Sequence, residues 1–205
     1  MTTENFDKAA KEWDQKSRRV MLAEIIGNAI MELPLSKEMD GMEYGCGTGL
    51  VGMAIAPSLQ SLTAIDTSQG MLDVLQEKIQ NQDTAVINTH CCDLLADDYT
   101  QKHDLIFCSM ALHHIQDANG LLQRFTELLN PGGYLAVADL ITEDGSFHKA
   151  SMEGIWHKGF DPEELKNILK NFDMEDIKSE IIHTIVREDN DKGYPVFLLT
   201  GRKVT

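Results

Sequence analysis

The amino-acid sequence predicts an α/β fold built around a doubly wound, mostly parallel sheet. Short apolar runs alternate with stretches in which apolar residues recur at helical spacing, a pattern typical of repeated strand–helix units. A glycine-rich segment, Gly45 to Gly49, follows the first apolar run and leads into a helical stretch. The polar segment 188–193 separates the last two apolar runs and suits an antiparallel hairpin. At 205 residues, the chain is expected to form one domain.

Two helices are expected first. Apolar positions at helical spacing, among them Phe6, Trp13 and Ile26, predict helices near residues 6–14 and 18–33. The alternating units come next. Strands are expected near residues 39–44, 62–66, 84–89, 103–109 and 133–140, with helices near 48–57, 69–81 and 117–129 between them.

The C-terminal part changes from this alternation to a helix followed by two strands. Asp161 suits the capping position of a helix, and Pro162 suits its first turn, so a helix is expected from there to about Phe172. Strands near residues 176–187 and 194–203 then complete the fold.

The net charge restricts the partners that the chain can have. Asp and Glu outnumber Lys and Arg by 33 to 18, which gives a formal charge of -15. A nucleic-acid partner is therefore not expected, because phosphate backbones are bound by clustered cations. Lys16, Arg18 and Arg19 form a small basic cluster that can mark an anionic ligand, but a solvated helix face is the favoured interpretation.

Targeting segments and metal sites are not expected either. No apolar run is long enough for a signal peptide or a membrane span, so we expect a cytoplasmic protein without a membrane partner. The cysteines lack the paired spacing of a zinc site or a disulfide framework, so reduced thiols and no metal are predicted. They are Cys46, Cys91, Cys92 and Cys108.

The glycine-rich segment predicts a ligand at the end of the first strand. Glycines allow close approach of the backbone to a ligand, and in doubly wound sheets ligands bind outside the carboxyl ends of strands. The dinucleotide fingerprint needs Gly or Ala five positions after Gly45, where this chain has Leu50, so an NAD-dependent dehydrogenase is disfavoured. The alternative is that these glycines only make a tight strand-to-helix connection.

Acidic residues follow the next two strands. Asp66 ends the second strand, where a carboxylate can accept hydrogen bonds from both hydroxyls of a ribose. Its alternative role is to cap the next helix, in competition with Ser68. Asp93 follows the third strand and can accept a hydrogen bond from an adenine amino group, or it is an exposed loop residue.

Taken together, these segments resemble the class I S-adenosylmethionine-dependent methyltransferases, in the style of the ubiquinone and menaquinone biosynthesis enzymes. The resemblance runs through most of the chain. It rests on Phe6-Asp7, Trp13-Asp14, Glu43 to Gly49, Asp66 with Met71, Asp93-Leu94, the segment from Asp104 to His114, and Asn130 to Leu135. The family pattern often has Asp and Leu where this chain has Glu43 and Tyr44.

The resemblance implies a seven-stranded sheet, mostly parallel with an antiparallel C-terminal strand, and a set of cofactor-binding residues. Glu43 and the glycine loop would border the methionine part of the cofactor, Asp66 the ribose and Asp93 the adenine. Leu94 and Met71 would sandwich the ring, the backbone of Cys108 to Met110 would face the methionine amino group, and Trp13 would close the pocket. The full set is Trp13, Glu43, Gly45, Cys46, Gly47, Thr48, Gly49, Asp66, Thr67, Met71, Asp93, Leu94, Cys108, Ser109 and Met110.

The expected reaction is methyl transfer by direct displacement, in which positioning of the acceptor supplies most of the catalysis. An acceptor that must lose a proton needs a base, and His113 or His114 after the fourth strand, or His157 in a later loop, can accept it. The alternative for the adjacent histidines is that one packs at a helix start and the other faces solvent. Trp156 and Phe160, beside His157, can likewise be core residues.

We expect residues 1–36 to cover the pocket, 37–140 to bind the cofactor, and 141–205 to supply the acceptor-side wall and the hairpin. A small molecule is the expected acceptor. A regulatory protein that binds S-adenosylmethionine without turnover, or a methyltransferase that acts on proteins, are alternatives. A monomer and a homodimer are both compatible with the sequence.

Overall fold

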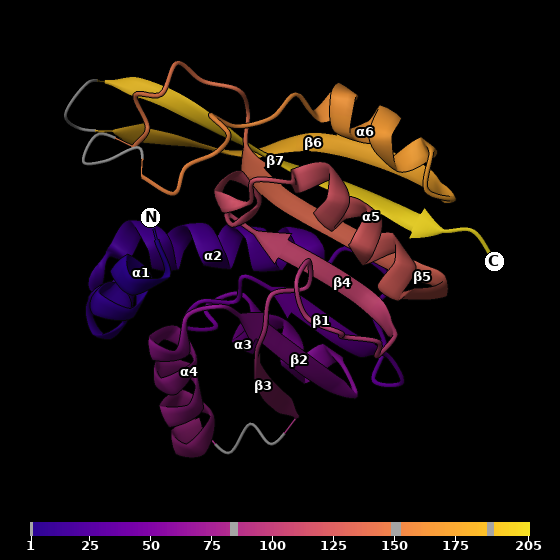
Figure 1. Cartoon of the computed structure of the whole chain (residues 1–205), viewed down its shortest axis with the longest axis horizontal. Coiled ribbons are helices and arrows are strands. Elements are labelled where there is room, and N and C mark those ends of the chain that lie inside the picture. The colour runs from indigo at the N-terminus through magenta and orange to yellow at the C-terminus, as the bar shows by residue number, and fades with distance from the viewer. Residues whose placement is uncertain (1, 83–85, 149–152, 188–190) are drawn as a thin grey trace.

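The computed structural model of the protein describes residues 2–82, 86–148, 153–187 and 191–205 (Figure 1). Its strands are β1 (Asp40–Tyr44), β2 (Ser61–Asp66), β3 (Ile87–Cys91), β4 (His103–Ser109), β5 (Leu129–Leu140), β6 (Met174–Arg187) and β7 (Lys192–Lys203). Its α-helices are α1 (Thr3–Ala9), α2 (Ser17–Ile30), α3 (Gly52–Ile55), α4 (Gln69–Gln82), α5 (Ala118–Leu128) and α6 (Pro162–Lys170). Among the described residues, three 3-10 helices accompany them: η1 (Ala10–Gln15), η2 (Ala56–Ser58) and η3 (Leu112–His114).

The seven strands form one sheet in the order β3-β2-β1-β4-β5-β7-β6. The pairs from β3 to β5 are parallel, and β7 runs antiparallel to both β5 and β6. This confirms the expected seven-stranded, mostly parallel sheet with an antiparallel C-terminal strand. The order reverses between β1 and β4, which is the switch point where such sheets bind ligands.

The strand register brings the carboxyl ends of β1, β2 and β4 together. Tyr44 at the end of β1 is paired with Ile65 on one side and with Cys108 on the other. The residues that follow, including Asp66 and Ser109, therefore lie at the same edge of the sheet. In Figure 1 the arrow of β4 points toward the side of the molecule where α1 and α2 lie.

Helices cover both faces of the sheet, as alternation along the strands requires. In β4, Leu105 and Phe107 pack in a cluster with α2, α3 and α4, whereas Ile106 and Cys108 pack in a second cluster with α5 and α6. The near-continuous burial of β4 is that of a strand covered on both faces. The fold is therefore doubly wound, as predicted.

Local sequence signals account for the starts of α5 and α6. Asp117 accepts a hydrogen bond from the backbone N–H of Gly120 at 2.8 Å, and Asp161 accepts one from Glu163 at 2.9 Å. Pro162 lies in the first turn of α6, as predicted. Each cap fixes where the chain leaves the sheet and enters a helix.

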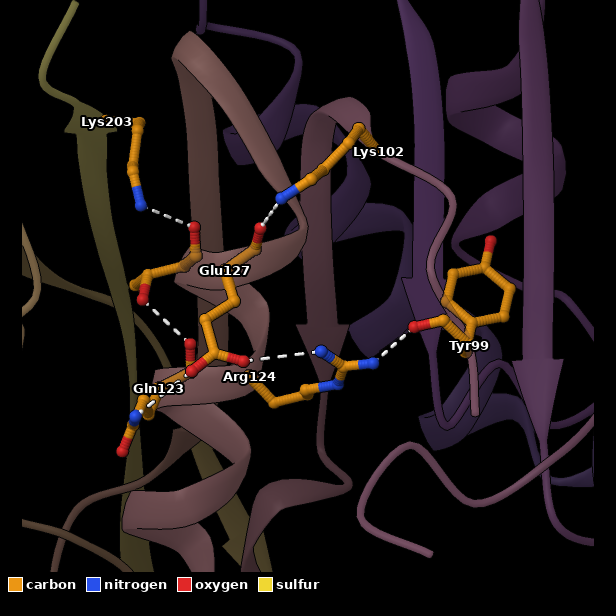
Figure 2. Close-up of polar contacts among 7 residues, drawn as sticks. Tyr99, Lys102, Gln123, Arg124, Glu127 and Lys203 are labelled. Carbon is orange, nitrogen blue, oxygen red and sulfur yellow. Dashed lines mark hydrogen bonds and ion pairs between the residues drawn. The ribbon is translucent and has the colours of Figure 1, made fainter. Parts of the chain in front are cut away.

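Cations hold the C-terminal end of α5 (Figure 2). Lys203, at the end of β7, donates to the backbone oxygen of Thr126 at 2.7 Å, and Lys102 donates to that of Glu127. Arg124 reaches the backbone oxygen of Tyr99 and lies 3.3 Å from the Glu127 carboxylate. The last carbonyls of a helix have no partner within the helix, and positive charge is favoured there. These contacts anchor α5, which continues directly into β5.

The structure differs from the expectations mainly at element ends. The helix expected near 48–57 is the short α3 followed by η2, because Gly47 and Gly49 have positive φ and Pro57 lacks a backbone N–H. The helix expected near 6–14 is divided into α1 and η1, and β5 begins at Leu129 rather than near residue 133. Residues 84 and 85 of the expected third strand and 188–190 of the expected hairpin loop lie outside the described residues.

Candidate active site

The glycine-rich loop after β1 adopts a conformation that depends on its glycines. Gly45, Gly47 and Gly49 have φ values of 68°, 53° and 78°. A Cβ atom on Gly45 would lie 2.4 Å from Cβ of Ala111, so this glycine is also needed for the close approach of the segment after β4. The loop thereby keeps its backbone at the switch point of the sheet.

Asp66 ties the end of β2 to this loop. Its Oδ2 accepts the backbone N–H of Gly47 and its Oδ1 accepts that of Ser68, each at 2.8 Å. Burial raises the pKa of Asp66, and the backbone hydrogen bonds from Ser68, Gly47 and Thr67 oppose that rise. The Oγ of Ser68 accepts the N–H of Met71, so Ser68 takes the helix-capping position that was one alternative for Asp66.

Two aspartates fasten the N-terminal segment over the loop. Asp7 accepts hydrogen bonds from Ser68 Oγ at 2.6 Å and from the N–H of Gly70 at 2.9 Å, and these lower its pKa. Asp14 accepts a hydrogen bond from Thr48 Oγ1 at 2.6 Å and forms an ion pair with Lys78. We call these contacts the aspartate clasp, because they hold α1 and η1 against the glycine loop and α4.

The clasp positions an aromatic wall. The guanidinium of Arg19 lies 3.4 Å from the ring centroid of Trp13 and donates to the backbone oxygen of the same residue. Phe6 packs against Trp13 with ring centroids 5.7 Å apart and against His114 at 5.2 Å. The basic cluster is therefore not wholly solvated, since Arg18 and Arg19 both line the cavity described below.

Glu43 is a buried carboxyl group at the end of β1. Its side chain passes over Gly52, where a Cβ atom would lie 2.2 Å from Oε2, and that oxygen has no hydrogen-bond partner among the described residues. Burial, followed by the charge of Asp66, raises its pKa to about 8. Glu43 is therefore neutral at pH 7 and becomes charged readily if a cation binds beside it.

Glu43, Asp66 and most of the glycine loop line one cavity of about 300 Å³ at the carboxyl ends of β1, β2 and β4. The predicted site residues that line it are Trp13, Glu43, Gly45, Cys46, Gly47, Thr48, Asp66, Thr67, Met71, Ser109, Met110 and His113. The cavity continues from this polar end to a mostly apolar one, formed by α2, the end of β6 and the segment around Phe147. One cavity therefore contains both the polar end beside the glycine loop and the mostly apolar end.

A cluster of three histidines, His113, His114 and His148, also lines the cavity. Nδ1 of His113 lies 2.7 Å from Oδ1 of Asp139 at the end of β5. The rings of His113 and His114 lie 4.1 Å apart, and His148 lies 5.1 Å from the former and 5.9 Å from the latter. The described residues contain no group of three or more His, Cys, Asp or Glu side chains placed to bind a metal ion.

His114 does not face solvent, in contrast to one of the alternatives drawn from the sequence. It is half-buried, its Nδ1 lies 2.8 Å from the backbone oxygen of Gly154, and Phe6 covers its ring. Burial, followed by the charge of His113, lowers its pKa to about 3. His114 is therefore a neutral wall residue near pH 7.

Five predicted site residues do not line the cavity: Gly49, Asp93, Leu94, Cys108 and His157. Asp93 accepts the N–H of Leu95 in its own turn, and Leu94 and Cys108 are buried in the core. Nε2 of His157 lies 3.0 Å from the backbone oxygen of Ile115, a contact that fixes two loops. The cavity lends no support to side-chain roles of Asp93, Leu94 and His157, whereas the roles expected of Gly49 and of the Cys108 backbone concern main-chain atoms and stay predictions.

The sequence reasoning missed Asp139, His148 and the aspartate clasp. Asp139 had a signal, because it lies at the end of its strand as Asp66 does. His148 had none, since it follows β5 in an irregular segment and reaches the site only through tertiary packing. Residues 149–152, within the segment 141–205 that was expected to supply the acceptor-side wall and the hairpin, lie outside the described residues.

Comparison with known proteins finds sequence similarity to methyltransferases over part of the chain. Residues 42–133 match the model of a methyltransferase domain. An uncharacterized methyltransferase of Schizosaccharomyces pombe is 32% identical over 148 residues, which are 65% of this chain and 52% of that protein. A ubiquinone biosynthesis O-methyltransferase of Coxiella burnetii is 32% identical over 96 residues, 46% of this chain and 40% of that protein. The chain thus spans about half the length of the curated relatives that it matches.

Solved structures show the same fold at lower sequence identity. Phosphoethanolamine N-methyltransferase 2 of Haemonchus contortus, solved in complex with S-adenosyl-L-methionine, is similar with a TM-score of 0.74. The identity is 16%, and the match covers 98% of this chain and 60% of that one. No helix among the described residues is long and apolar enough to cross a membrane.

Proposed function

We propose that this chain, whose residues 42–133 match a methyltransferase domain and whose sheet is doubly wound, transfers a methyl group from S-adenosylmethionine to a small-molecule acceptor. The observation that carries the proposal is the cavity itself. It joins the glycine loop, Glu43 and Asp66 to the His113–Asp139 pair. A cofactor bound at the glycine-loop end of the cavity would lie next to an acceptor bound beside His113, which would act as the base.

The polar end of the cavity fits the cofactor. Above Gly47 a Cβ atom would meet nothing closer than Met71 Sδ at 4.0 Å, so the loop leaves room for a ligand against its backbone. Asp66 would hold the ribose hydroxyls, and the unpartnered oxygen of Glu43 would face the positively charged methionine end. When bound, S-adenosylmethionine supplies a methyl group on a cationic sulfur, which keeps the electron pair of the broken carbon–sulfur bond.

The chain's own residues would then orient the acceptor and take up its proton. Asp139 accepts a hydrogen bond from the Nδ1–H of His113, so the neutral imidazole has a lone pair on Nε2. Within the described residues, no hydrogen bond engages that atom. His113 would accept the proton of the acceptor at Nε2 while the acceptor atom forms its bond to the methyl carbon. The aspartate clasp and Trp13 would keep water away from the reacting atoms.

Calorimetric titration with S-adenosylhomocysteine tests the cofactor site directly. We expect micromolar binding, strong weakening by Asp66→Ala, and no binding of NAD. Asp73→Ala is the matched control, because Asp73 is an exposed carboxylate on α4 that accepts a hydrogen bond from Gln69. Asp66→Asn, which keeps a carbonyl oxygen for one of the two backbone N–H groups, separates loss of the ligand contact from loss of the loop.

Two results would contradict the proposal. A folded protein that binds neither S-adenosylhomocysteine nor S-adenosylmethionine has no such cofactor site. A protein that binds both, but forms no S-adenosylhomocysteine with any small-molecule acceptor in a broad panel, is instead a binding protein or acts on a macromolecule.

A further inference from the structure

We propose that His148 binds the nucleophilic oxygen of a hydroxyl-bearing acceptor, next to His113. This rests on the proposed function and adds the acceptor class and a second residue that contacts it. His148 lines the cavity, and its ring centroid lies 5.1 Å from that of His113. A ligand atom at Nε2 of His113 is therefore within reach of His148.

The first argument is that the His148 ring has no hydrogen-bond partner within the described residues. Its Nε2 is buried and unpaired, and none of these residues forms a hydrogen bond with Nδ1. The neighbouring histidines are each anchored: His113 by Asp139, His114 by the backbone of Gly154, and His157 by that of Ile115. A polar ring left unpaired in a cavity wall is unfavourable unless a ligand completes its hydrogen bonding.

The second argument is that the segment carrying His148 is held in place from several sides. Glu143 Oε2 accepts the N–H of Phe147 at 3.0 Å, and Arg187 on β6 donates to the backbone oxygen of Phe147. The hydroxyl groups of Ser146 and Tyr194 lie 2.7 Å apart. The ring of Phe147 packs against His148 at 4.8 Å. Such support positions a binding group before the ligand arrives, which is what a specific site needs.

The third argument concerns charge. Burial, followed by the charge of His113, lowers the pKa of His148 to about 4, so the ring is neutral near pH 7. A neutral imidazole carries one N–H donor. His148 can therefore donate a hydrogen bond to the acceptor while its own ring stays uncharged.

These roles together select a hydroxyl group. A hydroxyl oxygen has one proton and two lone pairs. The O–H bond breaks and its proton moves to Nε2 of His113, one lone pair accepts the N–H of His148, and another forms the bond to the methyl carbon. A primary amine has a single lone pair, which the methyl transfer itself uses. The apolar residues Leu22, Ile26 and Ile115, which line the same cavity, suit an apolar body such as an aromatic ring.

Phenol and aniline, which differ only in the polar atom, are the probes. Their affinities for the complex of the protein with S-adenosylhomocysteine would be measured by NMR titration, with the histidine ring signals assigned. We expect phenol to shift the ring signals of His148, and His148→Phe to raise the Kd of phenol by roughly two- to ten-fold, as for the loss of one hydrogen bond. His148→Gln, whose amide can donate a hydrogen bond, should recover part of the affinity. Aniline should respond much less to these substitutions, because its nitrogen lone pair is delocalised into the ring and accepts a hydrogen bond only weakly.

His90→Phe is the matched control, because His90 is an exposed histidine on β3 outside the cavity. Absence of phenol binding by the wild-type complex, equal phenol affinity in His148→Phe, or an equal loss for aniline would overturn the inference. These outcomes count when S-adenosylhomocysteine still binds. If it does not bind the wild-type protein, the proposed function itself fails. Shifts of the His148 ring signals in the wild-type complex decide the case if His148→Phe folds poorly.

Discussion

Nδ1 of His113 lies 2.7 Å from Oδ1 of Asp139, and the two side chains are 2% and 0% exposed. Burial alone would raise the pKa of Asp139, but the charge and hydrogen bond of His113, together with the N–H groups of Leu140 and His113, hold it below its usual range. The carboxylate therefore stays charged and fixes the imidazole with its proton on Nδ1. Parallel pairing of β4 with β5 brings these two distant residues together.

Replacing Asp139 by Asn should remove the base without removing the cofactor site. The amide N–H of the introduced side chain would face Nδ1 of His113 and favour the tautomer with its proton on Nε2, which cannot accept another. We expect methyl transfer to a hydroxyl acceptor to fall by about 10²- to 10⁴-fold, with S-adenosylhomocysteine binding unchanged. The rate of methyl transfer is measured as the formation of S-adenosylhomocysteine from S-adenosylmethionine in the presence of phenol. Asp144→Asn, at an exposed carboxylate paired with Lys192, should have no such effect.

Binding of S-adenosylmethionine should strengthen as pH rises toward 8. Glu43 has a pKa of about 8 in the free protein, and a cation beside it favours the charged carboxylate, so binding releases a proton. The affinity should therefore rise between pH 6 and 8, by at most about ten-fold per pH unit, and level off above. Calorimetry in buffers of different ionisation enthalpy measures the proton release directly. The idea fails if Glu43→Gln, which cannot ionise, keeps the same pH dependence.

Loss of the aspartate clasp should weaken cofactor binding, although Asp14 does not itself line the cavity. Asp14→Ala removes the acceptor of the Thr48 hydroxyl and the partner of Lys78. A charge-assisted hydrogen bond contributes about 1.5–3 kcal/mol, so S-adenosylhomocysteine should bind roughly ten-fold or more weakly. Faster proteolysis within residues 2–16 should accompany the change. Glu12→Ala, at an exposed carboxylate in the same 3-10 helix, should leave both measurements as in the wild type.

The sequence was sufficient for the fold because each element carries its own local signal. The apolar run of β4 predicts a buried strand, and Asp161-Pro162 predicts the start of α6. Both signals lie in consecutive residues, which periodicity and capping rules describe. The extent of α3 was harder to predict, because the positive φ values of Gly47 and Gly49 shorten a segment whose composition suits a helix. Element ends follow from such backbone details, which single-sequence patterns describe poorly.

Some residues of the site could likewise be predicted from local sequence patterns, and others could not. Glu43, Gly47 and Asp66 lie at strand ends and reach the cavity as expected, since parallel strands end at one edge. The contacts of Asp7 and Asp14 join residues 34 to 64 positions apart, and no local pattern predicts such pairs. His148 lies in no helix or strand, and the backbone of the preceding residue, Phe147, is held by Glu143 and Arg187. Tertiary contacts of this kind require coordinates.

The stability of the protein should depend on pH through His103, a histidine far from the cavity. It is fully buried, and its Nε2 lies 2.8 Å from the Tyr99 hydroxyl. Burial lowers its pKa from 6.5 to about 4 despite the charges of Asp40 and Asp104. Between pH 6.5 and 4 the unfolded chain therefore binds a proton that the folded protein does not. This contribution to the free energy of unfolding is complete above pH 6.5 and is lost as pH falls toward 4.

Urea unfolding at pH 7 and pH 5 measures this contribution. Wild-type stability should decrease more between these pH values than that of His103→Phe, because the variant has no imidazole to protonate in the unfolded state. The variant is expected to be less stable at pH 7, where it lacks the hydrogen bond to Tyr99. Tyr99→Phe is the matched control, since it loses the same hydrogen bond but keeps the buried imidazole and hence the pH dependence. Equal decreases in the wild type and in His103→Phe would show that His103 is protonated alike in the folded and unfolded states.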